Sequence, residues 1–281
     1  MFDKINKRKG RYETLILLGG FLIFFSFIAI LGFESSFFIV SLVIGGGIIL
    51  YSNDCIKKMS IEFKNKYIPE ALNKVFEDSF YKATEGFYES ELTSTRILTN
   101  QDRYKSEDLI SGSFEGVNFR SADVHQQDVR RHGKTTTIVT VFKGRVYEFD
   151  FFKNFKYNLL LLQPGKYRPF DNFKKIKLES IQFNSEFKIY AKNEHEAFYI
   201  LTPHFMEKLL VLDYEYYDKI YFSFKDNKLY IAIDNRIDNF DIRPFRPLNE
   251  SIIDEYVNEF NIIKDFITYL KLDSRLFEQQ L

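Results

Sequence analysis

The chain has almost no cysteine and no tryptophan: Cys55 is the single cysteine in 281 residues. One cysteine excludes an intramolecular disulfide framework and a cysteine-based zinc site. An excess of either charge is also missing, because 39 basic residues balance 39 acidic ones. The part beyond Lys58 is slightly acidic, and this excludes a basic nucleic-acid-binding domain on bulk charge.

Catalytic and nucleotide-binding motifs are missing as well. The sequence has no Gly-x-Gly-x-x-Gly, no Walker loop and no Gly-x-Ser-x-Gly. His195-Glu196 begins the zinc-protease pattern, but Tyr199 stands where the second histidine is required. We therefore assign no catalytic, cofactor-binding or metal-ligating residue, and we expect no cofactor.

Two long apolar runs stand near the N-terminus. The first, 14–33, is long enough to span a bilayer as a helix. The second, 37–51, reaches only about 22 Å as a helix, against a hydrocarbon core of roughly 30 Å, so flanking serines or local thinning must help. We predict a two-span transmembrane hairpin over 14–52, with a basic N-terminus (1–13) before it.

The charges around these runs predict their orientation. Basic residues precede the first run, Lys57 and Lys58 follow the second, and the turn at 34–36 has none. By the positive-inside rule, both termini and the soluble part are cytoplasmic. A cleaved signal peptide fits less well, because the run is too long and no small-residue cleavage site follows it. A single span with a re-entrant second segment, which places the soluble part outside, is the other alternative.

Glycines occupy both runs, at Gly19-Gly20 and Gly45-Gly46-Gly47. In an antiparallel hairpin the clusters fall at similar depth, where small residues let two helices approach closely. We predict that they pack the spans, and that leucine at Gly46 weakens the pairing. Two alternatives stay open: glycine is common in membrane helices, or these glycines form a homo-oligomeric interface.

Residues 53–88 have a helical pattern, which predicts a juxtamembrane helix that Pro69 kinks or restarts. Lys57, Lys58, Lys64 and Lys66 lie on its first part. They can contact anionic lipid headgroups, each contributing about 1 kcal/mol. An ordinary solvated face is an equally good interpretation.

Residues 89–281 are predicted to form a soluble α+β domain with an antiparallel sheet and flanking helices, with a subdivision near 163–172. The polar stretch 123–134 has no apolar period, so we expect a loop, in which His125 and His132 are ordinary surface residues. Strand patterns lie at 108–112, 114–119, 135–141 and 145–151, with a turn at Lys143-Gly144.

The last third has the clearest periodicity. It predicts a helix over 194–212 that Thr202-Pro203 divides, and a closing helix over 251–272. Between them, alternation at 219–233 around Asp226-Asn227 predicts a hairpin with one buried face.

Several of these segments together resemble a known family. The runs are 177–180, 187–190, 196–203, 205–210 and 220–233, with 140–144 and the N-terminal hydrophobic pair fitting the same plan. They resemble an uncharacterised bacterial domain-of-unknown-function family of membrane proteins. The resemblance implies two N-terminal transmembrane helices and a cytoplasmic α+β domain, often encoded near LemA-like membrane proteins, and it supplies no activity.

The function we expect is that of a membrane-anchored protein with a cytoplasmic interaction, scaffold or sensor domain. Its partners are the lipid bilayer and either a LemA-like membrane protein or a second copy, and not nucleic acid. The expected location is the bacterial cell (inner) membrane. A membrane-tethered hydrolase with an unrecognised site is the second hypothesis, and a subunit of a transport assembly the third.

Overall fold

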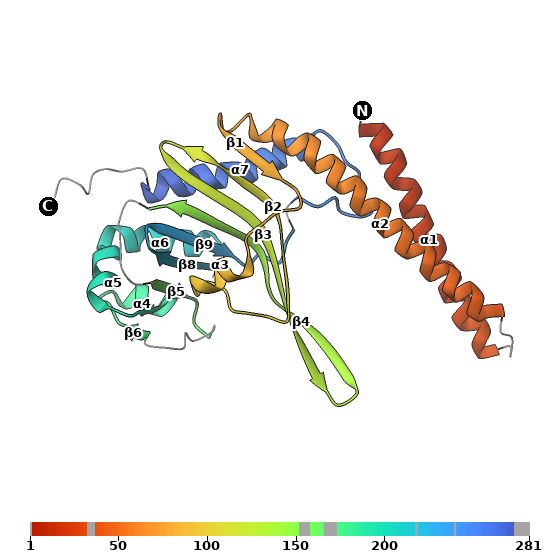
Figure 1. Ribbon diagram of the computed structural model, residues 1–281, viewed down its shortest axis with the longest axis horizontal. Coiled ribbons are helices and arrows are strands. Elements are labelled where there is room, and N and C mark those ends of the chain that lie inside the picture. The colour runs from red at the N-terminus through yellow and green to blue at the C-terminus, as the bar shows by residue number, and fades with distance from the viewer. Residues whose placement is uncertain are drawn as a thin grey trace. The chain divides into compact units, whose positions relative to one another are not determined.

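The computed structural model describes residues 2–32, 37–151, 158–165, 173–216, 219–238 and 240–272 (Figure 1). The chain divides into two compact units. One, the helical unit, comprises Met1–Ala71 and Phe240–Tyr256; the other, the sheet unit, comprises Leu72–Asn239 and Val257–Leu281.

Two long helices dominate the helical unit, α1 (Phe2–Gly32) and α2 (Phe37–Leu72). Both are long and apolar enough to cross a membrane, by length and composition. Each helix is continuous with a polar segment that the sequence separated from it. The basic N-terminus is the start of α1, and the first part of the predicted juxtamembrane helix is the end of α2.

The predicted helix over 53–88 is wrong beyond Leu72. Pro69 neither ends nor restarts α2, because it lies one turn from the end, where a missing backbone donor breaks little of the helix. Ser79–Lys82 forms strand β1, which pairs with Leu109–Gly112 of β2. Pairing with a distant strand here overrides a local helical period.

The sheet unit holds an antiparallel sheet with the strand order β1-β2-β3-β4-β9-β8-β5-β7-β6. The α+β fold class predicted from the sequence is therefore confirmed. The strands are β2 (Arg103–Phe114), β3 (Val117–His132), β4 (Thr135–Asp150), β5 (Leu159–Leu162), β6 (Lys174–Ile176), β7 (Lys188–Ala191), β8 (Ile220–Lys225) and β9 (Lys228–Ile233). The helices are α3 (Glu89–Ser94), α4 (Ile181–Glu186), α5 (Glu194–Ile200), α6 (Pro203–Glu215) and α7 (Ser251–Leu270), whose first turns belong to the helical unit.

Helices and loops cover the sheet on both faces. On one face Phe266 of α7 packs on Tyr147, with ring centroids 5.3 Å apart, and Phe187 packs 5.8 Å from Phe222. On the other face, the segment after α3 joins a core cluster with side chains of β3, β4, β8 and β9. There the hydroxyl of Ser223 donates to the carbonyl of Thr95 at 2.6 Å.

The covering of both faces corrects the prediction for one hairpin. The hairpin β8–β9 forms around Asp226-Asn227 as predicted, but both of its faces are buried. The alternation of Tyr221 and Ser223 with apolar residues predicted one solvated face. That face is buried because residues about 120 positions earlier cover it, and the sequence does not show this contact.

The region 103–150 also differs from the prediction. The stretch 123–134 is not a loop but continues β3, and Lys143-Gly144 is not a turn but lies inside β4. The turn falls instead after His132, at Gly133, whose φ of 58° favours glycine. A Cβ at Gly144 would lie 1.9 Å from the carbonyl oxygen of Ile233, so this glycine lets β9 approach closely. Beyond Gln127 and Thr140 the β3–β4 hairpin projects from the sheet (Figure 1).

The C-terminal helices confirm their predictions. α5 and α6 divide at Thr202, whose hydroxyl accepts from the Phe205 amide. Pro203 occupies the first turn of α6, where its missing donor costs nothing. α7 runs from Ser251 to Leu270.

Candidate functional site

Two glycines bring α1 and α2 into contact. A Cβ at Gly19 would lie 2.8 Å from the carbonyl oxygen of Gly45, and a Cβ at Gly45 would lie 2.8 Å from that of Gly19. In the part of the chain that the structure describes, a Cβ at Gly20, Gly46 or Gly47 meets nothing within 4 Å. Of the five glycines predicted to pack the spans, Gly19 and Gly45 therefore form the close contact.

Two serines add a polar contact between the same helices. The hydroxyls of Ser26 and Ser41 hydrogen-bond to each other, and Ser26 also bonds the carbonyl of Leu22. Interhelical hydroxyl bonds of this kind hold helices together in lipid. The sequence alone does not reveal this pair, because a serine within an apolar run does not indicate which way it faces.

Apolar side chains on both helices point away from this contact. Those more than half exposed are Leu17, Leu18, Phe21, Phe24, Phe25, Phe27, Ile28, Ile39, Val40, Val43, Ile44, Leu50 and Tyr51. Water-soluble proteins rarely expose so much contiguous apolar surface. The surface is suited to lipid contact.

The polar ends of α1 and α2 hold residues 240–250, which we call the strap. On α1, the Asn6 amide donates to the Leu248 carbonyl at 2.6 Å and accepts from the Leu248 amide at 2.8 Å. The Lys9 ammonium, 2% exposed, donates to the Arg246 carbonyl at 2.9 Å. These side chains satisfy backbone groups of an irregular segment, which otherwise lack partners.

On α2, the strap is held by Lys64, whose ammonium lies 2.7 Å from Asp241 Oδ1, and by Ser60, which accepts from the Ile242 amide at 3.3 Å. Lys64 is 2% exposed. Of the four lysines predicted to contact headgroups, Lys64 thus faces protein, whereas Lys57, Lys58 and Lys66 are exposed.

A groove of about 230 Å³ lies between the polar ends of the two helices. Its apolar floor is Ile5, Met59, Phe63 and Tyr67, and its charged rim is Lys4, Arg8, Glu62 and Lys66. Arg8 pairs with Glu62 at 3.2 Å, and both are largely exposed. The rim is net positive, which favours an anionic contact.

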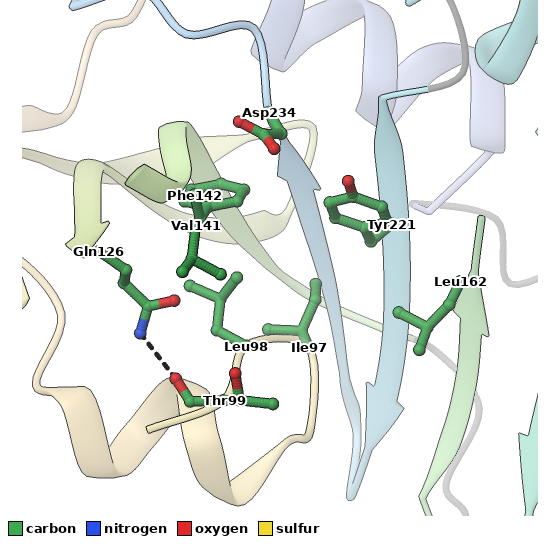
Figure 2. Close-up of a pocket in the computed structure, with 9 residues that line it drawn as sticks. All are labelled: Ile97, Leu98, Thr99, Gln126, Val141, Phe142, Leu162, Tyr221 and Asp234. Atoms are coloured by element: carbon green, nitrogen blue, oxygen red, sulfur yellow. Dashed lines mark hydrogen bonds between the residues drawn. The ribbon is translucent and has the colours of Figure 1, made fainter. Parts of the chain in front are cut away.

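The sheet unit has a pocket of about 70 Å³ beside β3, β4, β5 and β8 (Figure 2). Ile97, Leu98, Val141, Phe142, Leu162 and Tyr221 make its wall apolar. Gln126 donates to the Thr99 carbonyl at 2.8 Å (Figure 2). Asp234, at the top of the same view, pairs with Arg236 at 3.1 Å. The polar groups are therefore engaged with protein partners and do not form an acid–base pair.

A buried charged cluster crosses strands β2, β3 and β4. Arg145, in register with Asp123, donates to Asp123 Oδ1 at 2.8 Å and to the Asp108 carbonyl at 3.0 Å. Carboxylate oxygens of Asp108, Asp123 and Asp238 lie within 4.8 Å of one another. Burial raises the pKa of Asp123 to about 8; Arg145 opposes this, and Asp238 and Asp108 add to it.

The sequence alone does not reveal this cluster, because its pattern predicts a loop at Asp123. Asp108 lies at a break in the β2–β3 register, between Glu107 and Ile110, with a φ of 58°. A bulge of this kind re-aims one side chain and cannot be read from alternation. The available signal was the β-branched run 135–141 shortly after Gly133. Such a run favours a strand, and a strand needs a neighbouring strand to pair with.

A second ionic network is on the opposite face. Glu148, 3% exposed, accepts from Arg120 at 2.7 Å and from Lys228 at 2.7 Å. Burial raises the pKa of Glu148, but the hydrogen bonds from Arg120 and Lys228 outweigh burial, so the pKa lies below its usual value.

These features define the class: an α+β domain on an antiparallel sheet that follows two long apolar helices. Residues 140–272 match a family described as "Protein of unknown function (DUF3137)". Over these residues, the match confirms the resemblance drawn from the sequence, and the family that it resembles has no assigned activity.

No curated relative matches the chain. Among solved structures, it is similar to the crystal structure of the mycobacterial trehalose monomycolate transport factor A, TtfA, with 12% identity and a TM-score of 0.36. The alignment covers 73% of this chain and 94% of that chain. A likeness at this level identifies neither ligand nor partner.

Proposed function

We propose that the chain is an integral membrane protein whose hairpin of α1 and α2 anchors a cytoplasmic sheet unit that acts by binding. The observation that carries the proposal is the set of exposed apolar side chains on both helices. The same helices continue into polar ends that carry exposed basic residues and the strap. Apolar flanks for lipid and charged ends for the interface are what a membrane anchor requires.

The native cysteine gives a direct test of orientation. Cys55 is part-exposed on α2, two residues before Lys57. A membrane-impermeant maleimide should label Cys55 only after permeabilisation of the cells. The matched control is Ser35→Cys in a Cys55→Ser background, at the predicted opposite end of the hairpin, which should be labelled in intact cells. Labelling of Cys55 in intact cells would reverse the orientation.

We propose that Lys57, Lys58 and Lys66 contact anionic headgroups, and we leave Lys64 out because Asp241 holds it. Changing all three to glutamine should reduce the anionic lipid that co-purifies with the full chain, measured by lipid mass spectrometry. The control changes Lys174, Lys175 and Lys177, exposed residues of the sheet unit, in the same way. Equal lipid retention by both variants would show that the first three are an ordinary solvated face.

A binding role is favoured over a hydrolase by the pocket of Figure 2, which is small, mostly apolar and without a nucleophile beside a base among the described residues. By the family resemblance, the proposed partner is a LemA-like membrane protein; a second copy is the alternative. Affinity capture of a tagged LemA-like protein encoded nearby, carried out in mild detergent, should recover the full chain. Failure to recover it, together with a monomeric mass by light scattering, would count against both partners.

A further inference from the structure

We propose that Asp108, Asp123 and Asp238 bind one hard divalent cation in the sheet unit. Each contributes a carboxylate oxygen, and these oxygens lie within 4.8 Å of one another. Oxygens that ligate one Ca²⁺ at its usual distance lie at most about 5 Å apart. Separations in this range are compatible with one ion that contacts all three residues. This site is independent of the membrane topology proposed above.

A second observation points to a ligand: one oxygen of Asp123 lacks a partner. The Asp123 side chain is 9% exposed, and Arg145 occupies its Oδ1 at 2.8 Å. Its Oδ2 is buried and has no hydrogen-bond partner among the described residues. Leaving a buried charged acceptor unsatisfied is costly, and a cation would satisfy it.

The charges of the cluster favour the same conclusion. With all three carboxyls ionised, as a bound cation would require, Arg145 contributes one positive charge against three negative charges. Two nearby cations are engaged elsewhere, because Lys105 pairs with Glu107 and Arg236 pairs with Asp234. Lys143 lines the same cleft and reduces the excess of negative charge without removing it.

The backbone presents the ligands from three separate segments. The bulge in β2 carries Asp108, and Tyr81 on β1 donates its hydroxyl to Asp108 Oδ1. Asp123 lies within β3, and Asp238 follows β9 in irregular structure. Asp123 and Asp238 line a cleft of about 10 Å³, which has room for about one ion or water and excludes a larger ligand. Because Asp238 is half-buried at the rim, the cleft is open to ions from solvent.

The test uses the full chain in detergent, stripped with a chelator and titrated with CaCl₂, MgCl₂ or MnCl₂ in a calorimeter. We expect saturable binding of one ion per chain. Asp123→Asn and Asp238→Asn should each weaken the affinity at least tenfold. Asp226→Asn, in the turn between β8 and β9, is the matched control and should leave the affinity unchanged.

Terbium gives a local readout, since phenol rings sensitise its emission and Tyr81 touches a ligand residue. Ca²⁺ should displace Tb³⁺ and so reduce its emission. In Tyr81→Phe the Tb³⁺ emission should also fall, while Ca²⁺ binding measured by calorimetry persists. Far-UV circular dichroism and melting in chelator check that each variant folds. If Asp123→Asn does not fold, the affinity of Asp238→Asn for the cation decides whether the proposal holds. No saturable binding at millimolar Ca²⁺, Mg²⁺ or Mn²⁺, or binding that Asp238→Asn does not weaken, would overturn the proposal.

Discussion

The contact between Gly19 and Gly45 can be tested by an alanine substitution next to an internal control. Gly45→Ala places a Cβ 2.8 Å from the Gly19 carbonyl oxygen and 3.0 Å from Ile23 Cγ1, so the helices must separate. Gly46→Ala meets nothing within 4 Å among the described residues. Both changes replace glycine by alanine within α2, so both gain the same helix propensity, about 1 kcal/mol.

The difference between the two variants therefore isolates the contact. Overpacking of a tight interface costs about 1–3 kcal/mol, so Gly45→Ala should be less stable than Gly46→Ala by this amount. That corresponds to roughly 5- to 150-fold in the equilibrium for helix separation. From the sequence we expected that a large residue at Gly46 weakens the pairing. Because a Cβ at Gly46 meets nothing within 4 Å among the described residues, Gly46 becomes the control position.

The assay measures helix contact in mixed micelles with increasing SDS. Ser26→Cys and Ser41→Cys, introduced together in a Cys55→Ser background, place two thiols where the serine hydroxyls now hydrogen-bond. Disulfide formation should be lost at a lower SDS fraction with Gly45→Ala than with Gly46→Ala, and Gly19→Ala against Gly20→Ala should repeat the result. Equal SDS dependence in both matched pairs would refute the close contact.

Three further predictions concern stability: the first two are measured by denaturant unfolding of the full chain, and the third by limited proteolysis. Glu148→Gln should cost about 1.5–3 kcal/mol at neutral pH. Because the folded pKa of Glu148 lies below its usual value of 4.5, this contribution is fully present above that pH and is lost as the pH falls through the folded pKa. A difference from the native chain that stays constant as the pH is lowered well below 4.5 would contradict it. Thr202→Ala should cost about 1 kcal/mol through loss of the α6 cap, and Thr202→Ser should restore it. Lys64→Met should loosen the strap on α2 by removing the ion pair with Asp241, seen as faster proteolysis between β9 and α7, whereas Lys66→Met should not.

Local sequence patterns were sufficient to predict those features that depend on one short segment of the chain. The apolar runs, the Thr202-Pro203 boundary, the turn at Asp226-Asn227 and the stripe of α7 are each encoded within a few residues. Helix periodicity, caps and turns depend on neighbouring residues in the chain, so they can be read before any fold is known.

The candidate sites depended on contacts between distant segments. Asp108, Asp123 and Asp238 meet because a bulge, a strand interior and the end of β9 converge. Lys64 was grouped with its neighbours by sequence, and only Asp241, 177 positions away, shows that it faces protein.

The glycines combine both kinds of information. Their clustering in two apolar runs indicated helix packing, but the rotation of each helix about its axis selects which glycine touches the other helix. That rotation is set by the whole interface and not by the glycines themselves. Composition and periodicity determined the two apolar helices and the α+β class, whereas the choice of Gly19 and Gly45, the strap and the carboxylate cluster followed from tertiary packing, because each requires atoms that are close in space and far apart in the chain.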